Sequence, residues 1–135
     1  MTEYMLDNAW QQARQRLTGL EAWLDPGTIR HLEALGVDAG WQCWDVGSGG
    51  GSIAAWLGAR VGTSGHVLAT DIDTRFLDAL AAPNVEVRQH NVVTEPLPEG
   101  AFDLVHARAV LEHLPQREQV LERMVAALKP GGWLL

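Results

Sequence analysis

The sequence predicts an α/β fold: a doubly wound, mainly parallel sheet in residues 41–135, preceded by a helical segment in residues 1–40. From Trp41 onward, strand-like and helix-like stretches alternate, which is typical of parallel strands joined by crossover helices. A glycine-rich turn separates the first of these strands from the first of these helices. The first forty residues instead repeat apolar residues at helical spacing. These observations predict one domain with N-terminal helices.

Two helices are expected before the sheet. Residues 8–24 place their apolar side chains on one helix face. Asp25 is a suitable N-cap and Pro26 fits the first position of a helix, so a second helix is expected over 26–35. The segment 4–16 is a candidate lid over a ligand site, and simple docking on the sheet is the alternative.

The sheet is expected to contain five strands joined by three helices. The predicted strands are 41–46, 66–71, 84–89, 102–107 and 132–135, and the predicted helices are 51–61, 74–81 and 116–128. The chain ends within the fifth strand, which would leave an unpaired apolar edge over 132–135. Because such edges pair readily with other chains, we expect self-association through this strand.

Composition excludes several classes of protein. The chain has 135 residues, 47% of them hydrophobic and 20% charged, and a formal net charge of −7. An acidic chain without a basic run is a poor nucleic-acid binder, so no nucleic-acid partner is expected. No apolar stretch reaches the roughly 20 residues of a membrane span and no signal sequence is evident, so we expect a cytoplasmic protein without a membrane partner. The single cysteine, Cys43, excludes an internal disulfide, and no metal site is expected.

The segment 45–51, Asp-Val-Gly-Ser-Gly-Gly-Gly, predicts a site for a nucleotide-like cofactor. Glycines admit left-handed backbone and close approach of a ligand, and the following helix offers free N–H groups. A dinucleotide fingerprint would need a further glycine where Ser52 stands. The acidic Asp45 disfavours a pyrophosphate and suits a ligand with a cationic amino-acid end, such as S-adenosyl-L-methionine. Asp71, twenty residues after Gly51, is placed to bind a ribose diol.

With these motifs the chain resembles the class I S-adenosylmethionine-dependent methyltransferases from about Trp41 to Leu135. The resemblance implies a Rossmann-like sheet with strand order 3-2-1-4-5, truncated before the family's sixth and seventh strands. Five motifs carry it, in the family's order: Asp45-Val-Gly-Ser-Gly-Gly-Gly51, Val67-Leu-Ala-Thr-Asp71-Ile-Asp73, His90-Asn91-Val92, Phe102 to Arg108 with Leu111-Glu-His-Leu114, and Leu128-Lys-Pro-Gly-Gly-Trp133.

The resemblance also implies which residues contact the cofactor. Asp45 is expected to face the ligand ammonium, Asp71 the ribose, Asn91 the adenine amine, and Arg108 the ligand carboxylate or a substrate anion. His113 is the candidate general base if the acceptor must lose a proton. The full set of expected cofactor contacts is Asp45, Gly47, Ser48, Gly49, Gly51, Asp71, Ile72, Asn91, Val92, Ala107 and Arg108.

The predicted function is methyl transfer from S-adenosylmethionine to a small-molecule acceptor, leaving S-adenosyl-L-homocysteine, or the cofactor-binding part of such an enzyme. The atom methylated stays open among O, N, C and S. One alternative is a non-catalytic S-adenosylmethionine-binding or assembly module. Another is an NAD-dependent oxidoreductase, against which Ser52 and the turn 129–132 both argue.

Overall fold

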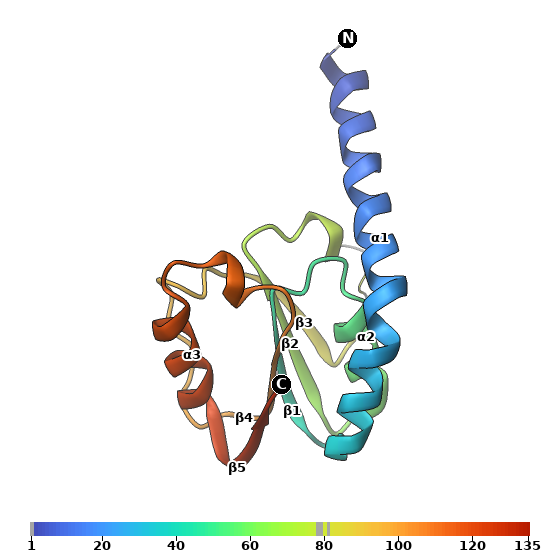
Figure 1. The fold of residues 1–135 in the computed structure, drawn as a ribbon. Helices are drawn as coiled ribbons and strands as arrows, with labels where there is room; N and C mark the ends of the chain where they lie inside the picture. Colours follow the sequence, from blue (N-terminus) through green and yellow to red (C-terminus); the bar gives the residue numbers. More distant parts are fainter. Residues whose placement is uncertain (1, 78–79, 81) are drawn as a thin grey trace.

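Five parallel strands form one sheet in the order β3-β2-β1-β4-β5, as predicted. The computed structural model describes residues 2–77, 80 and 82–135, with side-chain surroundings from residue 9 onward. The elements in chain order are α1 (Thr2–Leu35), β1 (Gln42–Val46), α2 (Ser52–Val61), β2 (His66–Asp71), the 3₁₀ turn η1 (Arg75–Leu77), β3 (Val85–Gln89), β4 (Phe102–Ala107), the 3₁₀ turn η2 (Leu111–His113), α3 (Arg117–Ala126) and β5 (Leu128–Leu134) (Figure 1).

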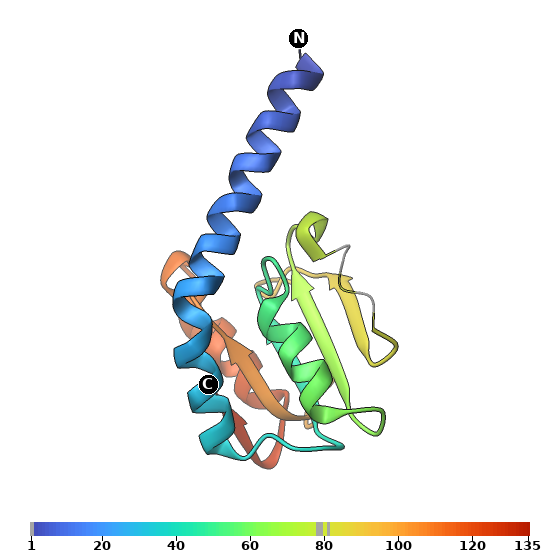
Figure 2. The same ribbon diagram turned by 90° about the vertical axis from the view of Figure 1, so that its right-hand side faces the viewer.

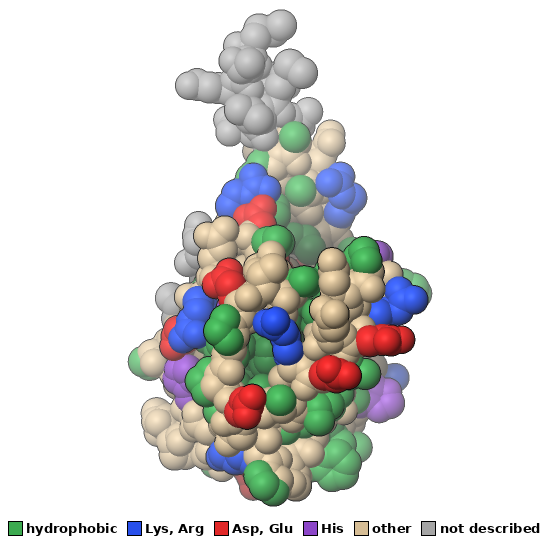
Figure 3. All heavy atoms as spheres, turned by 90° about the vertical axis from the view of Figure 1, so that its left-hand side faces the viewer, with side chains coloured by type: hydrophobic (Ala, Val, Ile, Leu, Met, Phe, Trp, Pro, Cys, Tyr) green, Lys and Arg blue, Asp and Glu red, His purple; other side chains and the backbone are tan. Residues whose placement is uncertain are grey.

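The two faces of the sheet are covered by different helices. Figures 1 and 2 show α1 and α2 on one face and α3 on the other. Successive strand residues point to opposite faces, so Cys43 packs with α1 and α2 while its neighbour Trp44 packs with α3. The α3 face carries charged side chains of both signs around a hydrophobic patch (Figure 3). Burial on both faces explains why the three central strands, β1, β2 and β4, each contain adjacent apolar residues.

The prediction of two N-terminal helices is wrong, because α1 continues through Asp25 and Pro26. Asp25 does not cap a new helix. Its carboxylate forms an ion pair with Arg108, whose guanidinium Nη2 lies 2.9 Å from Oδ1. The guanidinium also donates to Thr28 Oγ1 at 2.9 Å. These contacts with a residue far along the chain hold the helix together on both sides of Pro26.

Other boundaries also differ from the prediction, and the helix expected over 116–128 is α3, which ends at Ala126. β5 begins at Leu128, not at residue 132, because Leu128 pairs with Phe102 before a register shift and Trp133 pairs with Leu104 after it. The residues between them include Gly131, whose φ of +81° turns the chain out of the ladder. The helix expected over 74–81 is, in its described part, the short turn η1; residues 78, 79 and 81 lie outside the described residues.

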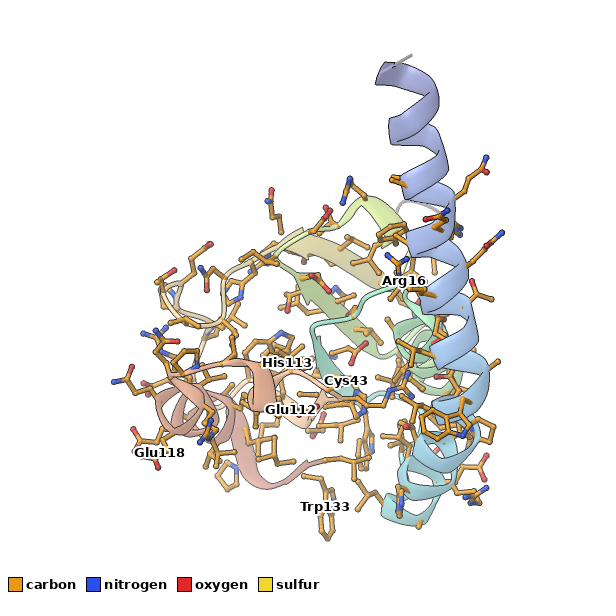
Figure 4. The ribbon with its side chains drawn as sticks, turned by 45° about the horizontal axis from the view of Figure 1, so that its top comes forward. Arg16, Cys43, Glu112, His113, Glu118 and Trp133 are labelled. Atoms are coloured by element: carbon orange, nitrogen blue, oxygen red, sulfur yellow. The ribbon has the colours of Figure 1, made fainter. Side chains whose placement is uncertain are left out.

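β5 lies at one edge of the sheet, and its Trp133 is 49% exposed and points away from the rest of the molecule (Figure 4). Trp133 is therefore an exposed apolar side chain on the edge strand of the described sheet, while self-association through β5 stays a prediction. Within the described ranges, no helix combines the length and the apolarity that crossing a membrane requires.

Candidate functional site

A pocket of about 290 Å³ opens at the carboxyl ends of β1 and β4. From β1 the chain passes through α2 to β2 on one side of the sheet, whereas from β4 it passes through α3 to β5 on the other side. The direction in which successive strands are added therefore reverses between β1 and β4. Ligands of open α/β sheets bind at such switch points. The lining residues are Leu17, Leu20, Glu21, Leu24, Asp45, Gly47, Ser48, Gly49, Gly50, Ser52, Ile53, His106, Arg108, Ala109 and His113.

The glycine loop between β1 and α2 forms one side of the pocket. Gly47 has φ of +66°, and a Cβ built on it would lie 2.5 Å from Val110 Cγ2. Gly51 has φ of +86°, and its Cβ would lie 3.0 Å from Leu77 Cδ2. Both positions therefore favour glycine for conformation, and at Gly47 the contact with Val110 also leaves no space for a Cβ. Across the pocket, Ala109 is a non-glycine residue with φ of +58°, a strained conformation that is enriched at functional sites.

Asp45 and His106 form a buried pair in the pocket wall. They are register partners on β1 and β4, and their side chains are each 4% exposed. His106 Nδ1 lies 2.7 Å from Asp45 Oδ1, and Ser48 Oγ donates to Asp45 Oδ2 at 2.9 Å. Asp45, predicted to orient the turn and to face the ligand ammonium directly or through water, thus has each carboxylate oxygen engaged by its own chain. Ser48, also a predicted contact, turns its hydroxyl back toward Asp45.

Helix α1 supplies the opposite wall through Leu17, Leu20, Glu21 and Leu24. This stretch begins just after the predicted lid segment 4–16. Within that segment, Trp10 stacks on Phe76 of η1 with ring centroids 5.2 Å apart, whereas the side chain of Tyr4 lies outside the described residues. α1 is therefore docked over the glycine loop rather than only against the sheet.

Asp71 and Ile72 lie at the end of β2, outside the pocket lining. Asp71 Oδ2 accepts the Gly49 N–H at 2.9 Å and Oδ1 accepts the Asp73 N–H at 3.1 Å, so the carboxylate also supports the glycine loop. Ile72 is 65% exposed. Such an exposed apolar side chain beside Asp71 is suited to packing on a flat ligand group.

Asn91 and Val92 follow β3, which pairs with β2. The Asn91 side-chain carbonyl accepts the Val93 N–H at 3.0 Å and shapes the loop. Val92 lines a separate cavity over Trp44, on the α3 side of the sheet. The predicted adenine contacts thus lie at the neighbouring strand ends. Of the residues predicted near the methionine part, Asp45, Gly47, Ser48, Gly49 and Arg108 line the pocket, whereas Gly51 and Ala107 do not.

Ala107, Arg108 and His113 lie at the end of β4 and in the loop after it. The Ala107 N–H donates to the carbonyl of Leu135 at 3.0 Å. Arg108 lines the pocket while its guanidinium is held by α1, through a hydrogen bond to Thr28 and an ion pair with Asp25 whose geometry is not that of a hydrogen bond. His113 is on the pocket rim with its side chain 73% exposed, next to Glu112 on η2 (Figure 4).

Residues 44–135 match the family model described as a methyltransferase domain. The fold is also similar to the crystal structure of a SAM-dependent methyltransferase from Aquifex aeolicus, with 26% identity and a TM-score of 0.74, over 89% of this chain and 69% of that one. The chain belongs to the S-adenosylmethionine-dependent methyltransferases. The family, fold and cofactor predicted from the five motifs are confirmed.

Curated members of this methyltransferase family are also similar in sequence. Methyltransferase str3 of Strobilurus tenacellus is 34% identical over 131 residues, which are 96% of this chain and 45% of that protein. The ubiquinone/menaquinone biosynthesis C-methyltransferase UbiE of Pseudomonas putida is 33% identical over 112 residues, 77% of this chain and 44% of that protein. The chain therefore spans less than half the length of these relatives.

The pocket residues fit the methyltransferase cofactor, which carries a cationic sulfonium and a cationic ammonium. Two lining residues are acids, Asp45 and Glu21, and a Cβ at Gly50 would collide with the Glu21 carboxylate, so this acid closes directly over the glycine loop. The positive charge of Arg108 is offset by Asp25. The balance of charge at this end of the pocket therefore favours a cation.

The family resemblance placed the segment 106–108 along the methionine part of the cofactor, but the predicted contacts did not include His106, nor Glu21 and its neighbours on α1. The expected strand order placed β1 beside β4, and both Asp45 and His106 stand next to last in their strands. This signal was sufficient to pair them. The α1 residues carried a weaker signal, a helical spacing that does not specify which partner the helix covers.

Proposed function

We propose that this chain binds S-adenosylmethionine in the pocket at the ends of β1 and β4 and forms the cofactor half of a methyltransferase active site. The observation that carries the proposal is the convergence of a left-handed glycine loop, a buried acid and an α1 wall at the switch point of a sheet with this family's strand order. Asp71 would hold the ribose hydroxyls, and the glycine loop would pass beneath the sulfur-bearing part.

In this proposal the chain holds the cofactor in position and excludes water from it. When bound, the cofactor supplies a methyl group on a positively charged sulfur. Glycines at 47, 49 and 50 line the pocket without adding side chains to it, and the aliphatic side chains of α1 shield the ligand from solvent. Such positioning contributes much of the rate enhancement in a direct displacement. His113, exposed on the rim, would take a proton from an acceptor that must lose one.

The proposed acceptor is a small molecule. The net charge of −7 disfavours a polyanionic substrate such as nucleic acid. The UbiE relative, named for ubiquinone and menaquinone biosynthesis, supports a small organic acceptor methylated at carbon. The cytoplasmic location expected from the sequence stays a prediction.

Calorimetric titration with S-adenosylhomocysteine, with NADH in parallel, tests the cofactor assignment. We expect micromolar binding of the first alone. Asp71→Asn should lower the affinity about tenfold or more, since hydrogen bonds to a charged group contribute roughly 1.5–3 kcal/mol each. Asp73→Asn is the matched control, because Asp73 pairs with Arg75 at the surface. Preferential NADH binding, or equal effects of both variants, would contradict the assignment. Binding without turnover over a panel of acceptors would favour the non-catalytic module.

A further inference from the structure

In the buried Asp45–His106 pair, Asp45 contacts residues of its own chain, while one ring nitrogen of His106 is left for the pocket. Asp45 Oδ1 contacts His106 Nδ1 at 2.7 Å, and Asp45 Oδ2 accepts from Ser48 Oγ at 2.9 Å. Imidazole has two ring nitrogens, and the carboxylate engages one of them. Nε2 is therefore the nitrogen of His106 that remains to serve the pocket, which this residue lines.

The carboxylate determines what Nε2 can do. When Nδ1 donates its proton to a carboxylate, the neutral ring keeps a lone pair on Nε2, and the contact fixes both tautomer and ring orientation. The pair is also held by the sheet, because Asp45 and His106 are register partners on adjacent parallel strands. In that tautomer His106 presents a rigid acceptor, buried to the same extent as Asp45 itself.

The charges around this acceptor select its ligand. Glu21 faces the same pocket from α1, and Asp45 stands behind the ring. The Arg108 guanidinium forms an ion pair with Asp25 and a hydrogen bond with Thr28, both on α1. An acceptor between two acids, with the neighbouring guanidinium already paired, is suited to a cationic donor.

We propose that His106 Nε2 accepts a hydrogen bond from the ammonium of the cofactor's amino-acid end, and that Asp45 acts through His106 as a positioning residue. This assignment rests on the proposed function and deepens it. It puts the His106 ring between Asp45 and the ammonium, where the sequence suggested a contact either direct or through water. It also makes His106 a residue that distinguishes ligands with the amino-acid end from those without it.

Two ligands separate this role from a structural one: S-adenosylhomocysteine, and 5′-methylthioadenosine, which lacks the amino-acid end. His106→Asn keeps an amide N–H for Asp45 and removes Nε2. We expect it to weaken S-adenosylhomocysteine binding about tenfold, the effect of one hydrogen bond to a charged group, and to change methylthioadenosine binding less than about twofold. Asp45→Asn should show the same selective loss. His66→Asn is the control, because His66 begins β2 at the opposite end of the sheet and should alter neither affinity.

Equal losses for both ligands, or no loss for either, would overturn the assignment while leaving the proposed function intact. Failure of the unmodified chain to bind either ligand would overturn the proposed function and the assignment with it. If His106→Asn does not fold, nitrogen NMR of the unmodified chain gives the second measurement. The Nε2 resonance of His106 should shift on saturation with S-adenosylhomocysteine and not with methylthioadenosine, and identical shifts would refute the contact.

Discussion

Replacing Pro26 by alanine should stabilise the protein, and the sign of the effect tests the continuity of α1. Pro26 lies inside this helix and lacks the N–H that would bond to the carbonyl of Ala22. A helix-interior proline is less favourable than alanine by about 3 kcal/mol. Alanine also gives the unfolded chain more conformational freedom than proline does. This entropy reduces the expected gain in the free energy of unfolding by roughly 0.4–1 kcal/mol. Pro26 is exposed, so its ring buries little surface that alanine would lose.

The net expectation is a gain of roughly 2 kcal/mol in the free energy of unfolding. Urea titration followed by circular dichroism measures the gain, and amide hydrogen exchange locates it in α1. Gly27→Ala is the control, because residue 27 is helical whether α1 is one helix or two, and its Cβ would meet only the end of Arg30 at 3.7 Å. Gly27→Ala should raise the free energy of unfolding by about 1 kcal/mol whether α1 is one helix or two.

A loss or no change for Pro26→Ala, together with a gain for Gly27→Ala, would refute the continuous helix. In that case Pro26 would occupy the first position of a second helix. There its missing N–H is harmless and its fixed φ is favourable. The two arrangements therefore predict effects of opposite sign from the same substitution.

Three further predictions concern the core, the glycine loop and the sheet edge. Burial raises the pKa of the Cys43 thiol to about 12, so the folded protein should resist thiol reagents at pH 8, and rapid labelling would contradict this. Because the unfolded thiol ionises first, stability should also fall as pH rises above its ordinary value of about 9. Gly47→Ala should lower the free energy of unfolding by about 2 kcal/mol through its left-handed φ and its contact with Val110, and an unchanged urea midpoint would argue against the loop geometry. Trp133→Glu should reduce self-association through β5 in sedimentation velocity, whereas unmodified chain that stays monomeric at all concentrations would exclude it.

The sheet was predictable because each strand carries its own signal. Cys43 and Trp44 are adjacent apolar residues, and a strand that is buried on both faces requires such a run. The glycines after β1 were equally informative, since few other arrangements need several left-handed residues so close together. Strand order followed from the family resemblance rather than from local pattern.

The N-terminal helix and the partners inside the site were harder to predict, because distant residues decide them. Asp25 before Pro26 is a good cap in isolation, and the competing partner, Arg108, lies in another motif altogether. Asp45 was expected to contact ligand, yet His106 reaches it first through strand pairing. The amide of Asn91 likewise satisfies its own loop. Local propensity and motif spacing do not predict which of several possible partners a side chain contacts in the folded protein.

The position of β1 between β2 and β4 has a consequence for the order in which the chain acquires its structure during synthesis. β1 pairs first with β2, which follows it in the chain directly after α2. Its second neighbour is β4, where Leu104 pairs with Cys43 although the two residues are 61 positions apart in the sequence. Chains emerge N-terminus first, and contacts of long sequence separation form slowly. The half-sheet β3-β2-β1 can therefore assemble with an open edge before β4 arrives. The pocket, whose walls come from both sides of that junction, therefore cannot form until β4 has paired with β1.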